Sequence, residues 1–422
     1  MKIDAIRVLN LFKFYKILII SFTFIILFFQ VALSKLSILP SFSDELVLAG
    51  ILLVSITRSF IDPIIKKFMQ IYFIAFIFFF LISLGAIPHR GIFSVCLQIF
   101  IHLKFILFVS FIWMTLGVKH ALKASYIFLA ITIVFLFINI FTNDLFNQLF
   151  DTVVMKRGWG VRPIGIQADT ASLGTTIALF GCLLICSFKN ISNNIKMLAL
   201  ILFSILVILS TVRTALILIP LIVLWWLKDS MKSFFIALLF IVVMGVSLKS
   251  TDYTDEIIDI TVQNIEWTVE NPVESAYIRG IMLFFSVDIA NSRFPIGTGA
   301  ATYGTVTSDD SYVYAEIGLH NSRFFIDKEG IYDSNFASLL GEFGYLGLIV
   351  FLYVFYLIMH VPIIKGKYEN NAEFRFVLYL LVVGYSIATP IFMNTYPAFI
   401  LALVIVASYH SVAPDLKNKN NS

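Results

Sequence analysis

The sequence predicts an all-α polytopic membrane protein with about 12 transmembrane helices and one large periplasmic loop that contains short helices. The first observation is composition: of 422 residues, 59% are hydrophobic and 13% are charged, and the mean hydropathy is +0.94. A soluble domain carries about 25% charged residues, so lipid must surround most of this chain. The second observation is a series of apolar runs, and the third is the uneven distribution of basic residues between them.

The apolar runs come close to the roughly 20 residues that cross a bilayer. The first is longer than the apolar region of a signal peptide and similar runs follow it, so we expect an uncleaved first span. The runs lie at residues 14–33, 43–57, 68–87, 92–117, 125–141, 170–188, 197–212, 214–227, 234–249, 335–363, 376–391 and 395–410.

Basic residues set the predicted orientation. With the N-terminus inside, 18 of the 30 lysines and arginines fall in inward segments and 11 in outward ones. The positive-inside rule therefore predicts two cytoplasmic termini in a bacterial inner membrane. Along the chain we expect a region of about nine spans at 1–249, a periplasmic loop at 250–332, and about three spans with a cytoplasmic tail at 333–422.

Several function classes lack support in the sequence. The net charge is only +4 and the basic residues are scattered, so we expect no nucleic-acid partner. Cys96, Cys182 and Cys186 lie inside apolar runs and are interpreted as packing residues. Asp309-Asp310 is interpreted as a solvated turn, so we expect neither a metal ion nor a cofactor.

Arginines beside the outward loops are the first candidate site residues. Arg213 lies between two apolar runs, where it either anchors the end of a span or holds a phosphate with its planar donors. Arg279, just after Tyr277, precedes an apolar stretch too short to span, which predicts an interfacial helix. Arg162, in the outward loop 142–169, is the third candidate cation.

A second set of candidates follows in the same loop. Gly297 and Gly299 permit a sharp turn whose amides approach a ligand, although an ordinary turn is by itself the better explanation of two such glycines. His320 is a candidate base. Asp333, or the serine after it, is placed to cap the helix that re-enters the membrane, and Glu342 inside that helix should face a polar partner.

The order of these pieces resembles the O-antigen ligase and polymerase superfamily over roughly residues 155–350. The sequence has Ser-x-x-Arg213, then Tyr277 and Arg279, then Pro-x-Gly297-x-Gly299, and finally Asp-Ser with Gly-x-x-Gly after nine residues. Ligases of the superfamily carry His where this chain has Asp333. His320 does not restore the pattern, because Ile occupies position 331. The chain is therefore most similar to Wzy-type O-antigen polymerases.

The resemblance implies a metal-independent glycosyltransferase. Such an enzyme transfers a glycan from undecaprenyl diphosphate to a hydroxyl of another lipid-linked repeat unit in the periplasm. Arg213 and Arg279 would stabilise the leaving diphosphate, and Asp333 or His320 would accept the hydroxyl proton. Arg162, Tyr277, Gly297 and Gly299 are the further substrate-binding candidates.

The implied partners are undecaprenyl-diphosphate-linked oligosaccharide repeat units, inner-membrane lipids and a chain-length regulator. Two alternatives stay open: an O-antigen ligase that acts on lipid A–core, and a lipid-linked oligosaccharide flippase or other transporter. A transporter should carry several charges within its spans, whereas here only His102, Lys104 and Glu342 qualify.

Overall fold

The computed structural model describes most of the chain as packed helices. The predicted runs at 214–227 and 234–249, apart from Ala215, and Arg213 before them lie outside the described residues. The described residues are 2–40, 42–142, 144–154, 156–157, 160–187, 192–212, 215, 263, 266–275, 277–320, 322–327, 330–364 and 372–409.

Helices form at each predicted apolar run that the structure describes. The elements are α1 (Lys2–Lys35), α2 (Ser43–Ser59), α3 (Pro63–Ile82), η1 (Leu84–Ala86), α4 (Ile87–Arg90), α5 (Ile92–Thr115), α6 (Gly117–Phe141), α7 (Leu145–Leu149), β1 (Lys156–Arg157), β2 (Gly160–Val161), η2 (Gly165–Gln167), α8 (Thr170–Ser187), α9 (Asn193–Leu209), α13 (Ile278–Ser292), η4 (Val306–Ser308), α14 (Tyr312–Glu316), α15 (Arg323–Ile326), α16 (Asn335–Ile364), α17 (Ala372–Ala388) and α18 (Thr395–Ser408). The two strands pair antiparallel as a short hairpin.

Among the described residues, five helices are long and apolar enough to cross a membrane, judged by length and composition. They are Leu18–Lys35, Pro63–Ile82, Ile92–Thr115, Gly117–Phe141 and Asn335–Ile363. Four further apolar helices, α8, α9, α17 and α18, are shorter. The helical membrane-type fold is therefore confirmed, while the count of twelve spans stays a prediction.

Local signals set the helix boundaries more closely than hydropathy does. Helix α3 begins five residues before the predicted run, because Asp62 caps it by accepting hydrogen bonds from the amides of Ile64 and Ile65 at 2.8 and 3.4 Å. Pro63 occupies the first helical position, where its missing N–H costs nothing. The helix thus takes Lys66 and Lys67 into its first turns, which hydropathy alone assigns to a loop.

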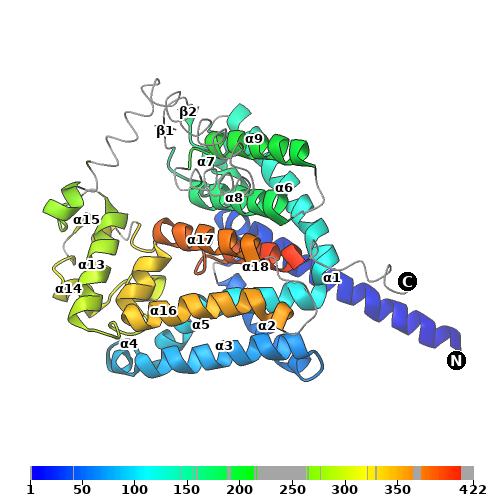
Figure 1. Cartoon of the computed structure of the whole chain (residues 1–422), viewed down its shortest axis with the longest axis horizontal. Helices are drawn as coiled ribbons and strands as arrows, with labels where there is room; N and C mark the ends of the chain where they lie inside the picture. Colours follow the sequence, from blue (N-terminus) through cyan, green and yellow to red (C-terminus); the bar gives the residue numbers. More distant parts are fainter. Residues whose placement is uncertain are drawn as a thin grey trace.

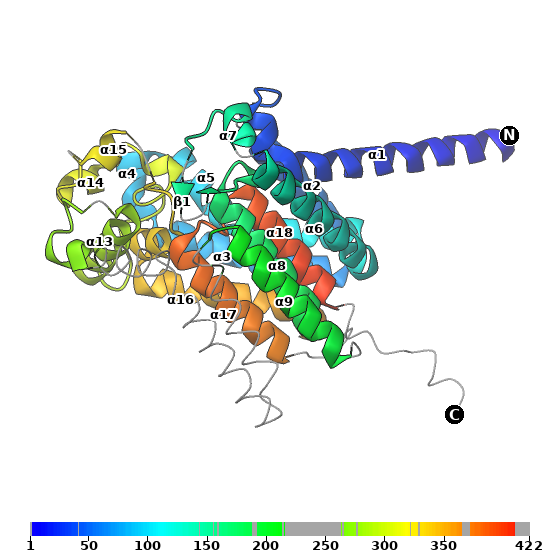
Figure 2. The same ribbon diagram turned by 90° about the horizontal axis from the view of Figure 1, so that it is seen from above.

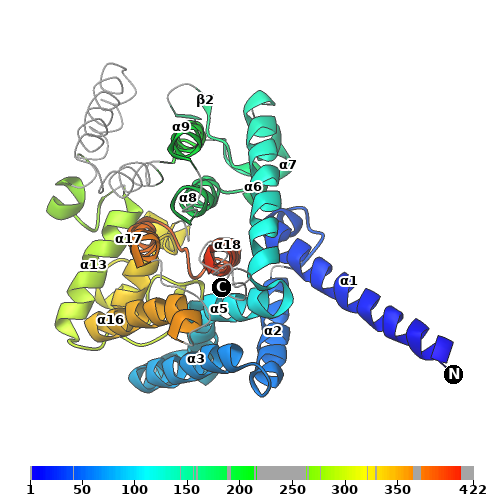
Figure 3. The same ribbon diagram turned by 45° about the vertical axis from the view of Figure 1, so that its right-hand side comes forward.

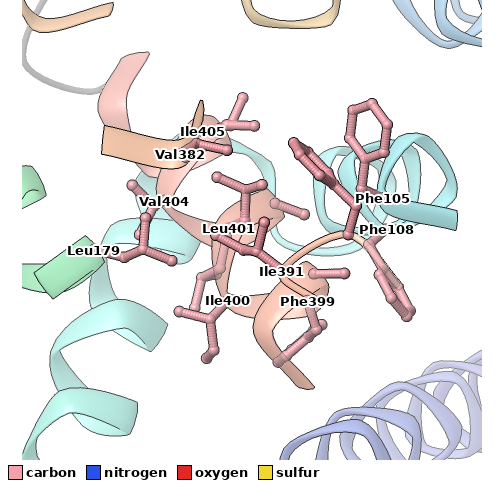
Figure 4. Close-up of a cluster of buried hydrophobic side chains, with 14 of the residues drawn as sticks. Phe105, Phe108, Leu179, Val382, Ile391, Phe399, Ile400, Leu401, Val404 and Ile405 are labelled. Carbon is pink, nitrogen blue, oxygen red and sulfur yellow. The ribbon is translucent and has the colours of Figure 1, made fainter. Parts of the chain in front are cut away.

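Helix α18 lies at the centre of the bundle, where α5, α6 and α8 pack around it (Figure 3). All of its residues are buried. Figure 4 shows side chains of α18 in one cluster with Phe105 and Phe108 of α5, Leu179 of α8 and Val382 of α17. Described residues of the predicted regions 1–249 and 333–422 therefore pack in one hydrophobic core, and the division of the chain into these regions stays a prediction.

The loop helices gather at one end of the bundle. Helices α13, α14 and α15 lie at the same end of the bundle as α4, where α3 ends and α16 begins (Figures 1 and 2). At the far end of α16, Arg375 donates to the carbonyl of Met359 and its guanidinium lies 4.9 Å from the centre of the Tyr409 ring. At each of these two ends of the bundle, segments predicted to lie on the same side of the membrane are found together. Which of the two ends faces the periplasm stays a prediction.

Helix α16 is interrupted, and a loop segment fills the interruption. Gly344 has φ 63° and ψ −167°, outside the helical region. The amides of Thr298 and Gly299 donate to the carbonyls of Gly341 and Glu342 at 3.0 and 2.6 Å, and the amide of Leu346 donates to the carbonyl of Pro295 at 3.2 Å. Backbone groups released by the break are therefore paired, as groups buried away from water must be.

We expect Gly297→Ala to destabilise the folded protein strongly. A Cβ at Gly297 would lie 2.1 Å from the carbonyl oxygen of Gly341 and 2.7 Å from the carbonyl carbon of Glu342, both backbone atoms that cannot turn aside. Overpacking of this kind costs about 1–3 kcal/mol or more. Thermal unfolding of the detergent-solubilised protein measures the effect.

The matched control is Gly384→Ala in α17, where a Cβ would meet nothing within 4 Å. This variant should keep the wild-type melting temperature, or raise it slightly because alanine favours helix. Equal melting temperatures for the two variants would contradict the tight fit of the loop in the break of α16.

Candidate functional site

An arginine and an aspartate 54 residues apart meet where the loop joins α16. Arg279 donates through Nε and Nη2 to the same oxygen, Oδ2 of Asp333, at 3.2 and 2.9 Å. The side chains are 32% and 40% exposed, so the pair borders solvent. Among the described residues, Oδ1 of Asp333 has no hydrogen-bond partner. The pair therefore offers both a cation and a carboxylate oxygen to a ligand.

Local sequence explains why these two side chains meet. Helix α13 begins at Ile278 and packs against α16, and its apolar face, including Ile281 and Phe285, is buried in a cluster with side chains of the loop. This packing fixes Arg279, on its first turn, beside the start of α16. The hydroxyl of Ser334 accepts the amide hydrogen of Ala337 at 3.1 Å and so takes the capping role. Asp333 is consequently left to pair with the arginine.

The electrostatics of Asp333 favour a basic carboxylate. Burial raises its pKa above the ordinary value of 3.8, Arg279 opposes that change, and the negative charge of Asp169 adds to it. Asp169 precedes α8 and accepts hydrogen bonds from the amides of Ala171 and Ser172 at 3.2 and 2.8 Å. The loop before α8 therefore brings a second carboxylate towards the pair.

The other predicted polar site residues are not joined to this pair by a described contact. Arg213 lies outside the described residues. Arg162 is half-buried between the hairpin and η2. Tyr277 immediately precedes α13, where its ring lies close to Gly280. His320 is exposed in a turn and, within the described part of the chain, forms no hydrogen bond or ion pair.

Gly297 and Gly299 have a packing role in the structure. The amides of the turn point at carbonyls of α16, and a Cβ at Gly299 would lie 2.7 Å from Cβ of Ala86. Gly299 also has φ +93°, a conformation that favours glycine. Ligand binding by these glycines stays a prediction, because the structure gives the amides of Thr298 and Gly299 protein partners.

Glu342 has the polar partners that its place in an apolar helix predicts. Its Oε2 lies 2.9 Å from Nε2 of His102, and its Oε1 accepts from the amide of Thr302 and the hydroxyl of Thr305, both at 3.1 Å. Glu342 and His102 are each 1% exposed. This carboxylate therefore ties α5 and α16 to the loop that fills the break in α16.

A second buried polar group lies deeper, around Lys104 of α5. Its Nζ donates to the hydroxyl of Thr395 at 2.8 Å, and that hydroxyl donates to Asp44. Lys104 and Asp44 are 4% and 6% exposed. The contact ties α2 and α5 to the start of the central helix α18. An ammonium inside a span is therefore accommodated by a hydroxyl and a carboxylate.

Asp169 and Asp44 were not among the residues selected from the sequence, although each has a recognisable local feature. Each stands at the start of an apolar run, the position at which an acid favours the helix N-terminus. Such acids usually act as caps, so nothing in their spacing pointed to Asp333 or Lys104. In the described part of the chain no group of three or more His, Cys, Asp or Glu residues is arranged to hold a metal ion.

Comparison of the chain with models of known protein families, and with curated proteins, gives no match. The resemblance to O-antigen ligases and polymerases therefore rests on the residue motifs, and the site is interpreted from its geometry.

Proposed function

We propose that this protein is a surface-polysaccharide polymerase of the inner membrane, acting on lipid-linked repeat units at the periplasmic face. It transfers a glycan from undecaprenyl diphosphate to a hydroxyl at the non-reducing end of another unit. The observation that carries the proposal is the Arg279–Asp333 pair, held at the end of a membrane-type helix and still open to solvent.

The pair suits both halves of this reaction. The acceptor oxygen attacks the anomeric carbon of the donor while its proton passes to the free oxygen of Asp333. The bond between the anomeric carbon and the diphosphate oxygen breaks, and the diphosphate leaves with the electron pair. Its added negative charge is stabilised by Arg279. Arg213 is proposed as a second cation and Arg162 as a third, with metal independence expected.

The glycan pattern of a deletion strain tests the polymerase function. A polymerase deletion should leave one repeat unit on the lipid A–core, and re-expression of the wild-type chain should restore the ladder. An O-antigen ligase, which has the same donor, would instead leave an unattached polymer. Surface glycan that keeps its wild-type ladder would contradict both assignments.

A transporter of lipid-linked oligosaccharides is the second candidate. The buried groups around Lys104 and Glu342 favour it, since ionisable residues inside spans often mark transport paths. Deletion of a flippase would remove repeat units from the surface altogether and accumulate them at the cytoplasmic face. Single units on the core therefore separate the polymerase from this candidate.

Asp169→Asn should move the acidic limb of the pH–rate profile to lower pH. A base works when deprotonated, so kcat/KM should rise with pH through the pKa of Asp333, which lies above 3.8. Removing the charge of Asp169 removes one cause that raises this pKa. Asparagine caps α8 about as well as aspartate does, so the fold should persist.

The control for this shift is Glu316→Gln, an acid whose partner Arg293 follows the end of α13 opposite to Arg279. Its pH–rate profile should match that of the wild type. An unchanged acidic limb in Asp169→Asn would assign the titrating base to a group other than Asp333.

A further inference from the structure

Four polar side chains, one of which directly precedes Asp333 in the chain, form a patch with no assigned role. Tyr332 donates its hydroxyl to Oδ1 of Asp309. The next residue, Asp310, pairs with Arg90 at 2.7 Å, and Arg90 also donates to the carbonyl of Thr307. We refer to Arg90, Asp309, Asp310 and Tyr332 as the Arg90–Tyr332 patch. It joins α4 to the segment before α16, at the end of the bundle where the loop helices gather (Figure 1).

The two sides of the patch differ in exposure. The side chain of Arg90 is 11% exposed, whereas that of Asp310 is 84% exposed. The neighbouring ring of Tyr312 lies 4.5 Å from that of His89, which holds the start of α14 against α4. The guanidinium is thus fixed while the carboxylate of Asp310 is presented to solvent. An ion pair this exposed adds little to folding, so stability alone gives no reason for it.

The chemistry of the patch matches a sugar. Each sugar hydroxyl both donates and accepts, so it can bridge a carboxylate and a guanidinium. The phenol ring of Tyr332, which is half-buried, adds an apolar surface with a polar end. A free phosphate fits less well, because two carboxylates would repel it.

The place of the patch relative to Asp333 completes the argument. Tyr332 directly precedes Asp333, whose Oδ2 is held by Arg279 and whose Oδ1 has no hydrogen-bond partner among the described residues. Because Tyr332 and Asp333 are consecutive residues, a sugar that contacts the ring of Tyr332 can extend to the carboxylate oxygen that is open to a hydroxyl.

We propose that the Arg90–Tyr332 patch is the subsite for the acceptor sugar, the non-reducing end of the incoming repeat unit. This inference rests on the proposed polymerase function and adds the acceptor to it. The acceptor hydroxyl gives its proton to Asp333 and forms the new bond to the anomeric carbon. The donor diphosphate, which leaves with the electron pair, lies on the side of Arg279.

A two-substrate assay with the purified full-length protein in lipid nanodiscs tests the subsite. The donor is the lipid-linked repeat unit extracted from the host membrane. The acceptor probe is the same repeat unit released from its lipid and labelled at its reducing end. The KM for each substrate is measured separately at saturating concentration of the other.

Asp310→Ala should raise the KM for the released acceptor at least about tenfold, since hydrogen bonds to a charged group are lost. Turnover at saturating acceptor and the KM for the donor should change less than about twofold. This is the pattern expected when a lost contact is made equally to the bound acceptor and to the transition state. Asp310→Asn, which keeps the shape, should raise the acceptor KM less. Tyr332→Phe, which removes only the hydroxyl, should act in the same direction.

Glu316→Ala is the matched control, because Glu316 forms an exposed pair of the same 2.7 Å length with Arg293 in the same loop. It should leave both KM values at wild-type level. An unchanged acceptor KM in Asp310→Ala and Asp310→Asn would overturn the subsite, as would an equal rise in Glu316→Ala. Absence of transfer by the wild-type protein would instead overturn the polymerase function, and the subsite with it.

Discussion

Replacing Arg279 with alanine is expected to abolish polymer formation while protein levels stay normal. Loss of a fixed group that stabilises developing charge lowers turnover about 100- to 1,000-fold. The substitution has a second effect, because Arg279 lowers the pKa of Asp333. Without it the carboxyl group stays protonated up to a higher pH, so less of the deprotonated base is present in acidic solution. Glycan ladders from a complemented deletion strain, together with immunoblots, give the measurement.

Arg279→Lys should restore polymer only in part. A lysine keeps the charge, but a single ammonium cannot reproduce the two donors, Nε and Nη2, that Arg279 directs at Asp333. Arg293→Ala, just beyond the other end of α13, is the control and should keep the ladder. A normal ladder from Arg279→Ala would refute the assignment of the diphosphate site.

Asp333→Asn is expected to reduce transfer about 100- to 10,000-fold, the usual contribution of a general base. Asparagine keeps the size of the side chain and an oxygen for Arg279. Helix α16 keeps its cap, because Ser334 performs that role. The loss should therefore appear in turnover with a normal melting temperature. The assay with purified protein and lipid-linked donor measures both.

His320→Ala provides the contrast. His320 is exposed and is not joined to the Arg279–Asp333 pair, so this variant should retain wild-type turnover. Full activity in Asp333→Asn with loss in His320→Ala would move the base to His320. Full activity in both would mean that catalysis depends on positioning and the arginines alone.

The membrane character of this chain followed from composition, since 59% hydrophobic residues leave no other solvent for its surface. The helices followed from apolar runs bounded by polar residues, which are local properties of the chain. Where a boundary prediction was wrong, as at the start of α3, the cause was also local: Asp62 caps and Pro63 begins the helix. Such features need no knowledge of distant residues.

For the candidate site, the sequence indicated individual residues but not which of them lie together. Arg279 and Asp333 were each chosen from the sequence, by their places before an interfacial helix and before a re-entering helix. Spacing gave no sign that they pair, because 54 residues separate them. The partner of Glu342 was predicted to exist, yet His102 lies 240 residues away. The glycines of the turn at 297–299 illustrate the limit most plainly, since their motif fits a ligand-binding turn as well as an ordinary one and does not show what the turn packs against.

The sequence by itself therefore determined the class of protein, the helical runs and the list of candidate site residues. Tertiary structure alone decided that Gly344 breaks α16, that the turn at 297–299 fills the break, that the charge of Asp169 acts on Asp333, and that Arg90 pairs with Asp310 next to the contact between Tyr332 and Asp309. The physical reason is the separation along the chain over which each interaction acts. Hydropathy and capping act over one or two turns of helix, whereas ion pairs and the closing of a broken helix depend on which distant segments the packed core brings together.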